Sequence, residues 1–313
     1  MEATRRSPRL RLSAHPYWRA AILFFVLVAA SVAGASWWLT APLEDHLGPL
    51  VNSPGTAPVA LSPEEAAQPG VPPAWPEGRL EGRKAKKLLL DSMIAAADRL
   101  NEVDGYTATF KKQERLRGKL GPLQTMAMKV RQRPFAIYLK FLAPTPGKEV
   151  VYAEGHHDNK LIAHTPGVAG WLVPRLAVPP DHPIALAESR HAVTEAGLAN
   201  LTKRLIHFRE MDLNDPEAVT ILDRTTDEDG HARLRSIHTH PSPDPDRPFA
   251  RCEIFYDPET RIPVEIYNYD WPQPGHSGDL LLAERYRYED LNFNADLSAL
   301  DFDPANPDYA FRR

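Results

Sequence analysis

The chain has 313 residues, of which 43% are hydrophobic and 25% charged, enough for one full hydrophobic core plus additional segments. Cys252 is the only cysteine, which excludes an intrachain disulfide and a thiolate metal cluster. Residues 1–40 hold five of the 37 basic and one of the 41 acidic residues, so the rest carries about eight more acidic than basic groups. This balance argues against nucleic acid as a partner, and against an anionic membrane held by bulk charge.

Five arginines stand before an uncharged, apolar stretch at residues 20–40. In a helix, Trp18 and Trp37 would lie roughly 28 Å apart, close to the thickness of a hydrocarbon core. Tryptophans favour both membrane interfaces, and a basic flank stays in the cytoplasm. We therefore expect residues 1–19 in the cytoplasm, one transmembrane anchor at 20–40, and the domain on the periplasmic side of the cytoplasmic membrane. The alternative is a signal peptide cleaved near Ala33-Gly34-Ala35, which would release the protein into the periplasm.

Proline dominates residues 41–79, which contain nine of the 31 prolines. Such a stretch lacks the apolar surface that would offset its ordering entropy, and it predicts an extended linker. Residues 80–313 continue without another break in composition and predict one β-rich domain.

Apolar residues recur at helical spacing in residues 83–103, and then alternate with polar neighbours from 106 to 111, as in a half-buried strand. The pattern predicts further strands at 123–131, 135–141, 149–153, 160–164, 218–224, 232–240, 251–256, 262–269 and 280–288. An irregular, proline-rich stretch at 171–183 and a second helix at 189–209 interrupt them. Short strands joined by tight turns predict an α+β fold with an antiparallel sheet. The tail ends in Tyr309 and Phe311, which we expect to dock back onto the sheet.

Several motifs resemble those of a known group of proteins. Arg133-Pro134-Phe135 opens an alternating strand, and a hairpin runs from Tyr256-Asp257-Pro258 to Arg261-Ile262-Pro263. Both resemble the lipoprotein-carrier-like group that includes LolA and RseB. The C-terminal Tyr286-Arg287-Tyr288-Glu289-Asp290 and the stretch 301–309 resemble more closely an uncharacterised bacterial family, domain of unknown function 1571.

This resemblance implies a curved antiparallel sheet, a LolA-like half-barrel, covered by helices over an apolar face that in the carriers accepts acyl chains. The chain departs from the carriers in its N-terminal hydrophobic segment and in the insert at 171–183. Alternation marks a side chain as inward-facing without separating a filled core from a hollow one, so both alternatives stay open. The candidate cavity-lining, ligand-binding residues are Tyr106, Phe110, Phe135, Ile137, Leu139, Phe141, Tyr152 and Trp171.

Chemical motifs are few. His238 and His240 lie two apart on an expected strand, so their side chains share a face, as a two-histidine metal site requires. No acidic third ligand stands at a diagnostic spacing, so they are weak candidates, and no cofactor is expected. Asp227-Glu228-Asp229-Gly230 lacks the last ligand of a calcium loop and predicts a hairpin turn. The sequence has neither a nucleophile elbow nor a phosphate-binding glycine loop.

Three functions remain open. The first is a non-catalytic, membrane-tethered binding protein of the cell envelope for lipid, lipoprotein or another amphipathic ligand. The second is an envelope structural or sensing module with a filled core that docks another protein. The third is a metal-assisted hydrolase, which requires a carboxylate within ligand distance of His238 and His240.

Overall fold

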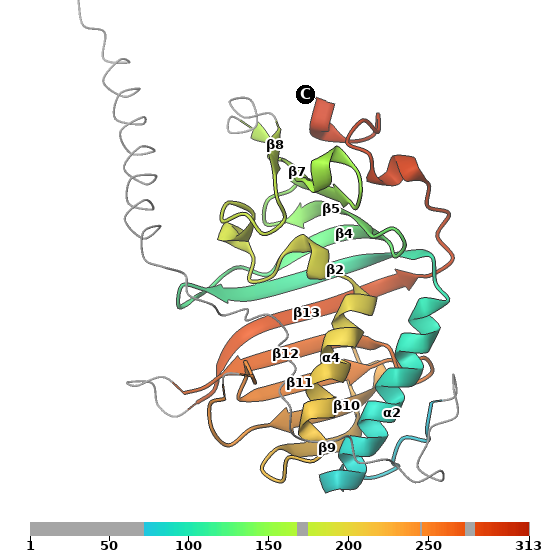
Figure 1. The fold of residues 1–313 in the computed structure, drawn as a ribbon, viewed down its shortest axis with the longest axis vertical. Helices are drawn as coiled ribbons and strands as arrows, with labels where there is room; N and C mark the ends of the chain where they lie inside the picture. The colour runs from blue at the N-terminus through green and yellow to red at the C-terminus, as the bar shows by residue number, and fades with distance from the viewer. Residues whose placement is uncertain (1–71, 168–174, 245, 273–278, 313) are drawn as a thin grey trace, which may run out of the picture. The chain divides into compact units, whose positions relative to one another are not determined.

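The computed structural model describes residues 72–167, 175–244, 246–272 and 279–312 (Figure 1). The predicted anchor at 20–40, most of the predicted linker, and Trp171 lie outside the described residues. Among the described helices, none combines the length and the apolar character needed to cross a membrane.

A large, open, curved antiparallel sheet forms the body of the domain (Figure 1). Its strands are ordered β1-β9-β10-β11-β12-β13-β2-β4-β5-β6-β7-β8, with β3 paired to β2 beside this path. The strands of the first part of the chain are β1 (Leu80–Glu81), β2 (Gly105–Leu116), β3 (Lys119–Leu120), β4 (Gln124–Arg131), β5 (Ala136–Ala143), β6 (Glu149–Ala153), β7 (Leu161–His164) and β8 (Leu176–Val178). The second part supplies β9 (Val219–Thr226), β10 (Ala232–Thr239), β11 (Arg251–Tyr256), β12 (Pro263–Asp270) and β13 (Leu281–Asn292). Pairing of β13 with β2 joins the two parts into one surface.

Two α-helices, α2 (Gly82–Asn101) and α4 (Leu198–Asp212), lie over the β9–β13 part of the sheet (Figure 1). We call the sheet face they cover the inner face. Helix α2 turns Leu89, Met93, Ala96 and Leu100 inward, and all four are fully buried. Their three- and four-residue spacing is the stripe from which the sequence predicted this helix.

The second predicted helix, 189–209, begins later than expected, at Leu198. Gly197 precedes it with φ of 96°, a left-handed backbone that ends helical continuity on its N-terminal side. A side chain at Gly197 would also approach the Tyr106 hydroxyl, because a Cβ there would lie 3.3 Å from it. Immediately before Gly197, residues 185–196 form only the short 3₁₀ turns η3 (Ala185–Glu188) and η4 (Val193–Glu195).

Both faces of the sheet are covered, by different parts of the chain. The main core lies between the inner face and the two helices, and includes Trp75, whose ring centroid lies 5.7 Å from that of Tyr256. Trp75 falls within the predicted linker 41–79, yet its indole nitrogen also donates a hydrogen bond to the Asp223 carbonyl. A second, smaller core forms on the opposite, outer face, where the C-terminal tail packs Phe302, Tyr309 and Phe311 against β5–β7. The expectation that this tail docks onto the sheet is confirmed.

Candidate functional site

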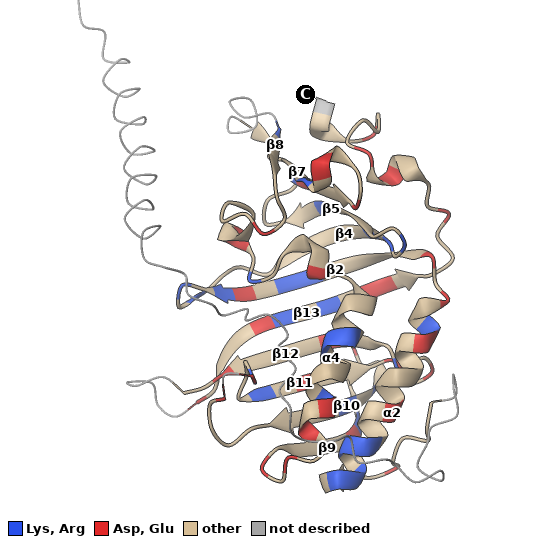
Figure 2. Cartoon of the chain, viewed as in Figure 1, with Lys and Arg blue, Asp and Glu red and all other residues tan. Residues whose placement is uncertain are grey.

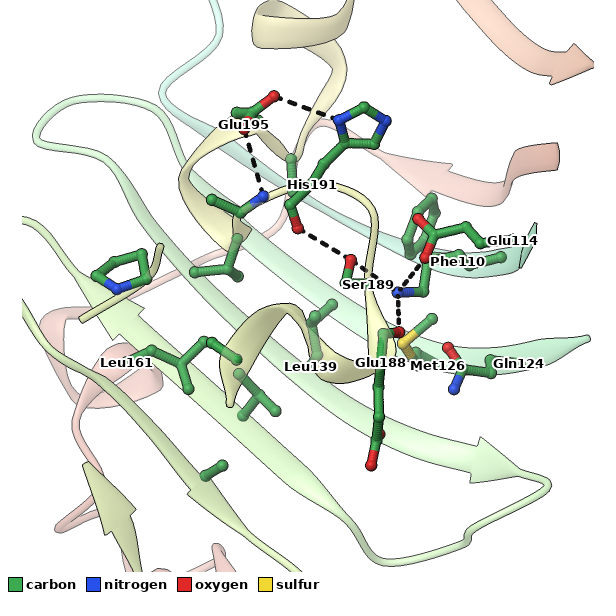
Figure 3. Close-up of a pocket in the computed structure, with 18 of the residues that line it drawn as sticks. Phe110, Glu114, Gln124, Met126, Leu139, Leu161, Glu188, Ser189, His191 and Glu195 are labelled. Carbon is green, nitrogen blue, oxygen red and sulfur yellow. Dashed lines mark hydrogen bonds and ion pairs between the residues drawn. The ribbon is translucent and has the colours of Figure 1, made fainter. Parts of the chain in front are cut away.

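An apolar cavity of about 390 Å³ lies on the inner face of the sheet, over strands β2 and β4–β8 and the neighbouring β13. Leu201 and Arg204 of α4 border it on one side. Phe110, Met126, Leu139 and Leu161 line it from the strands (Figure 3). Phe141 on β5 lines it as well. Residues 180–196, which contain η3 and η4, lie across it and supply its other wall; we call them the covering segment. The volume is within the range of pockets that hold small molecules or parts of larger ones.

The eight predicted lining residues divide into three groups. Phe110, Leu139 and Phe141 line the cavity. The other described residues are part of the packed core: Tyr106 and Ile137 are fully buried there, and the ring of Phe135 lies 6.2 Å from that of Tyr152. Trp171 lies outside the described residues. Ligand binding by the three lining residues stays a prediction.

Tyr106 has a structural task instead. Its hydroxyl accepts a hydrogen bond from the backbone N–H of Leu198 at 2.8 Å. That N–H is one of the first-turn donors of α4, which have no partner within the helix. A buried strand tyrosine thus fixes where α4 begins.

Several lining residues were missed by the sequence analysis. They are Met126, Val150, Leu161, Ala163, Leu176, Tyr286 and Tyr288. The alternation of β4 and β13 contained the signal for Met126 and for the two tyrosines. Which strands lie beside the cavity, however, depends on the order of strands in the sheet, which alternation does not contain.

A charged network closes one end of the cavity. Glu114 on β2 and Glu284 on β13 face each other across paired strands and are almost fully buried. The Tyr286 hydroxyl donates to Oε1 of Glu114 at 2.5 Å. Lys112 lies 3.3 Å from Glu114, and Asn268 donates to Glu284 at 2.8 Å. The two buried carboxylates are therefore satisfied by ionic and hydrogen-bonding partners, as burial of charge requires.

The covering segment is attached to the sheet through the same carboxylates. Arg190 and His191 both bind Oε2 of Glu284, at 3.1 and 2.9 Å. The backbone N–H of Arg190 donates to Glu114 at 3.1 Å. Two residues before Arg190, Glu188 forms an ion pair with Lys148. Figure 3 shows Glu114, Glu188 and His191 around the cavity.

His191 is charged in this setting. Burial by itself lowers its pKa, but hydrogen bonds to Glu195 and Glu284 outweigh burial and raise the pKa of His191 to about 9. Burial raises the pKa of Glu284, and the hydrogen bond from His191 more than reverses this, so that pKa lies below its ordinary value. Both groups are therefore ionised at neutral pH, and the attachment is an ion pair.

A second cluster of titratable groups lies under the C-terminal end of α4, where Asp212 meets the two predicted histidines. Nε2 of His238 lies 2.7 Å from Oδ2 of Asp212, and Nε2 of His240 lies 3.7 Å from Oδ1. The His238 contact is close but is not aligned as a hydrogen bond. The carboxylate that a metal-assisted hydrolase would require is thus present, supplied by a helix residue 26 positions before His238.

The charges around Asp212 oppose a metal there. Arg209 lies 3.1 Å from Oδ2, and the Arg247 Nε–H donates to Oδ1 at 2.9 Å, so each oxygen already has a cationic partner. Burial and the nearby Arg209 lower the pKa of His238 to about 3, which leaves the ring neutral with its Nδ1 2.7 Å from the Thr220 hydroxyl. A divalent cation would have to displace two guanidinium groups, so we assign this cluster a structural role.

The predicted calcium-like loop is a hairpin turn, as the sequence indicated. Asp227 accepts hydrogen bonds from the backbone of Asp229 and His231 between β9 and β10. Its second oxygen lies 2.8 Å from Arg233. Both carboxylate oxygens of Asp227 are therefore already bound, one by the backbone of the turn and the other by Arg233.

Fold and site together define a class: a large, open, curved antiparallel sheet with two helices and an apolar, partly covered cavity on the helix-bearing face. A family model described as "Protein of unknown function (DUF1571)" matches residues 103–311. The chain belongs to this family. No curated protein matches the sequence.

Three of the solved structures that the chain resembles are the following. An uncharacterized conserved protein from Thermus thermophilus is 10% identical, with a TM-score of 0.36 and coverage of 67% of this chain and 90% of that one. A LolA superfamily protein from Nitrosomonas europaea is 11% identical, with a TM-score of 0.31 and coverage of 68% and 97%. MucB is 17% identical, with a TM-score of 0.33 and coverage of 66% and 62%.

Proposed function

We propose that the protein is a non-catalytic binding protein of the cell envelope whose cavity takes the apolar chain of a lipid, a lipoprotein or another amphipathic ligand. The domain, residues 80–313 with Trp75 added, would be carried outside the cytoplasm. Residues 20–40 would anchor it in the membrane, or act as a cleaved signal, with the proline-rich stretch as the linker.

The observation that carries the proposal is the cavity itself. A closed core would place apolar side chains in mutual contact, whereas here Phe110, Leu139 and Phe141 border unfilled space. Water wets such a surface poorly, and an acyl chain fills it without needing hydrogen bonds. A structural or sensing module with a filled core has no use for this space, so the cavity favours the first function over the second.

The charged end of the cavity supports an amphipathic ligand over a purely apolar one. Lys112 and Arg204 border the same space as Phe110, so a ligand with its chain along the strands would bring its polar end to these groups. Each already has an ionic partner, Glu114 for Lys112 and Glu195 for Arg204. The polar end of a ligand would therefore replace one partner of an existing ion pair, and the net charge of the cavity would change little.

The test is extraction of the full chain purified gently from its own host, followed by mass spectrometry of the extract. We expect lipid or acylated material at close to one equivalent. Protein that carries no such material, together with a co-purifying protein partner, would instead establish the docking alternative.

A pair of matched substitutions locates the ligand. Ala163 lies on β7 and lines the cavity, so Ala163→Phe fills it; Ala127 on β4 is exposed, so Ala127→Phe adds the same ring elsewhere. We expect the Ala163→Phe variant to lose binding of a fluorescent fatty acid probe and the Ala127→Phe variant to keep it. Thermal unfolding of both variants checks that they fold. Equal binding by two folded variants would refute the assignment of the cavity.

A further inference from the structure

Exposed aliphatic side chains stand at the start of β4, near the end of β5 and in the covering segment, and we call them the apolar rim. Of the six large hydrophobic side chains that are exposed among the described residues, three belong to this rim: Leu123, Leu142 and Ile184. The ends of β4 and β5 that carry the two leucines are paired, with Thr125 opposite Ala143. Ile184 lines the cavity itself, and the neighbours Gln124 and Phe141 line it beside Leu123 and Leu142. The prolines at 122, 144 and 146 are exposed between them. Through Ile184, and through the chain neighbours of the two leucines, the rim adjoins the cavity wall.

A basic hairpin projects beside the rim. Strands β2 and β3 are joined by the two-residue turn Arg117-Gly118, in which both residues have positive φ, at 51° and 78°. This is the turn geometry that matches the twist of a hairpin, and it leaves Arg117 and Lys119 exposed at the tip. The blue end of β2 in Figure 2 leads to this tip.

The charges of this hairpin are unpaired, unlike those of the neighbouring strand. On β13, Arg285 and Arg287 each contact carboxylates, for example Glu265 and Glu289. Within the part of the chain that the structure describes, Arg115, Arg117 and Lys119 form no ion pair. Arg115 donates hydrogen bonds to the backbone oxygens of Leu282 and Gly118 and is near enough to Asp270 to interact with its charge, so the uncompensated cations are those at the tip, Arg117 and Lys119.

We propose that the apolar rim and the basic hairpin dock the domain onto an anionic phospholipid surface, with the cavity mouth against the lipid. Aliphatic side chains would enter the interface while the cations meet phosphate groups, each worth about a fivefold gain in partition. The net negative charge of the domain does not prevent this, because charges more than a Debye length from the surface are screened. The proposal rests on the proposed function in one respect: it names the source from which the cavity would take its ligand.

A membrane fits these features better than an acidic protein does. An acidic protein would pair with the cations of the hairpin, whereas a phospholipid surface offers both phosphate groups for the cations and an apolar layer for the aliphatic side chains. Ile184 of the rim also lines the apolar cavity, so the surface that the rim meets must tolerate an apolar contact there.

The experiment places a reporter in the rim of the full chain. The variant Leu142→Cys is labelled with an environment-sensitive fluorophore; Cys252 does not compete, because burial raises its pKa to about 12. The labelled protein is reconstituted with vesicles of phosphatidylcholine and phosphatidylglycerol that contain spin-labelled lipid. Ile94→Cys on α2 is the matched control, since Ile94 is an exposed aliphatic residue away from the rim.

We expect quenching of the label at position 142 and none at position 94. The N-terminal segment brings both variants to the vesicle equally, so a difference between them reports the orientation of the domain. Equal quenching at the two positions, or none at 142, overturns the proposal.

Charge reversal tests the second half of the surface. The double variant Arg117→Glu and Lys119→Glu should weaken the contact more than tenfold, as should vesicles of phosphatidylcholine alone or high salt. Quenching unchanged by charge reversal would refute the role of the hairpin. Polyglutamate that binds the hairpin while the label at position 142 stays unquenched would point to an acidic protein and refute the membrane.

The fatty acid assay separates this proposal from the proposed function. Loss of quenching at position 142 with probe binding intact would refute docking alone. If the label at position 142 is quenched but the cavity binds no fatty acid probe, docking is supported and the proposed ligand-binding role of the cavity is refuted.

Discussion

Nε2 of His191 lies 2.9 Å from Oε2 of Glu284 and joins the covering segment to the central strand β13. This contact is made across the polar end of an apolar cavity. It links two properties that can be measured separately: the charge of one histidine and the closure of the segment that covers the site.

The first prediction concerns stability at alkaline pH. The pKa of His191 is raised from its ordinary value of 6.5 to about 9. Its contribution to the free energy of unfolding is therefore fully present below pH 6.5 and is lost as pH rises through 9. A shift of this size corresponds to on the order of 3 kcal/mol. Urea unfolding between pH 6.5 and 9.5 should show this loss.

The matched variants for this prediction are His191→Gln and His156→Gln. The first should be less stable at pH 6.5 and should not lose stability over the alkaline range. The second changes an exposed histidine in a loop and should behave like the unchanged chain. Hydrogen exchange of residues 185–196 should rise in His191→Gln alone. An identical alkaline slope in all three proteins would disprove the ion pair.

The second prediction concerns acid. Burial and Arg209 lower the pKa of His238 to about 3. Below pH 6.5 this histidine is therefore protonated in the unfolded chain but stays neutral in the folded chain. The free energy of unfolding should thus fall as pH drops from 6.5 towards 3. Titration of the ring by NMR should find His238 neutral throughout pH 5–8. A ring that titrates near its ordinary value would contradict the prediction.

The third prediction concerns Asp212. Asp212→Asn removes the charge that Arg209 and Arg247 share. Arg247 keeps its ion pairs with Asp215 and Asp244, but the buried Arg209 loses the carboxylate with which it pairs. We expect a loss of about 3–5 kcal/mol, as for other buried ion pairs deprived of one partner. Asp223→Asn is the control, because Asp223 pairs with Arg235 in a more exposed position and should cost about 1 kcal/mol or less.

The same cluster distinguishes a structural role from a metal site. Zinc added to the unchanged chain should leave its thermal unfolding where it was. A rise in unfolding temperature that disappears in His240→Gln would show that the cluster binds metal, and would revive the hydrolase alternative.

The fourth prediction concerns the C-terminal tail. The rings of Tyr309 and Tyr138 stack with centroids 4.0 Å apart and planes within 5° of parallel. Tyr309→Ala should cost about 3 kcal/mol, because it removes a buried ring from the smaller core. Tyr309→Phe keeps the stack and loses the two hydrogen bonds of the hydroxyl, to the Asp301 carbonyl and from Lys129, so it should cost about 1–2 kcal/mol. Chemical denaturation measures both, and equal losses would mean that the stack contributes nothing.

Local pattern was sufficient for most of the elements. The stripe from Leu89 to Leu100 predicted α2, and period-two alternation predicted the strands, because both depend on neighbours within a few residues along the chain. The late start of α4 was not foreseen. It depends on Gly197 and on the Tyr106 hydroxyl, which comes from a strand 92 residues before Leu198.

The sequence by itself determined which side chains face inward, where turns fall, and that one cysteine and an acidic domain exclude several functions. Only the tertiary structure decided that Phe110, Leu139 and Phe141 border a cavity while Tyr106 and Ile137 fill a core. Only it brought Asp212 to His238 and His191 to Glu284. The physical reason is that alternation records one face of one strand, whereas a cavity or an ion pair depends on which distant segments fold across that face.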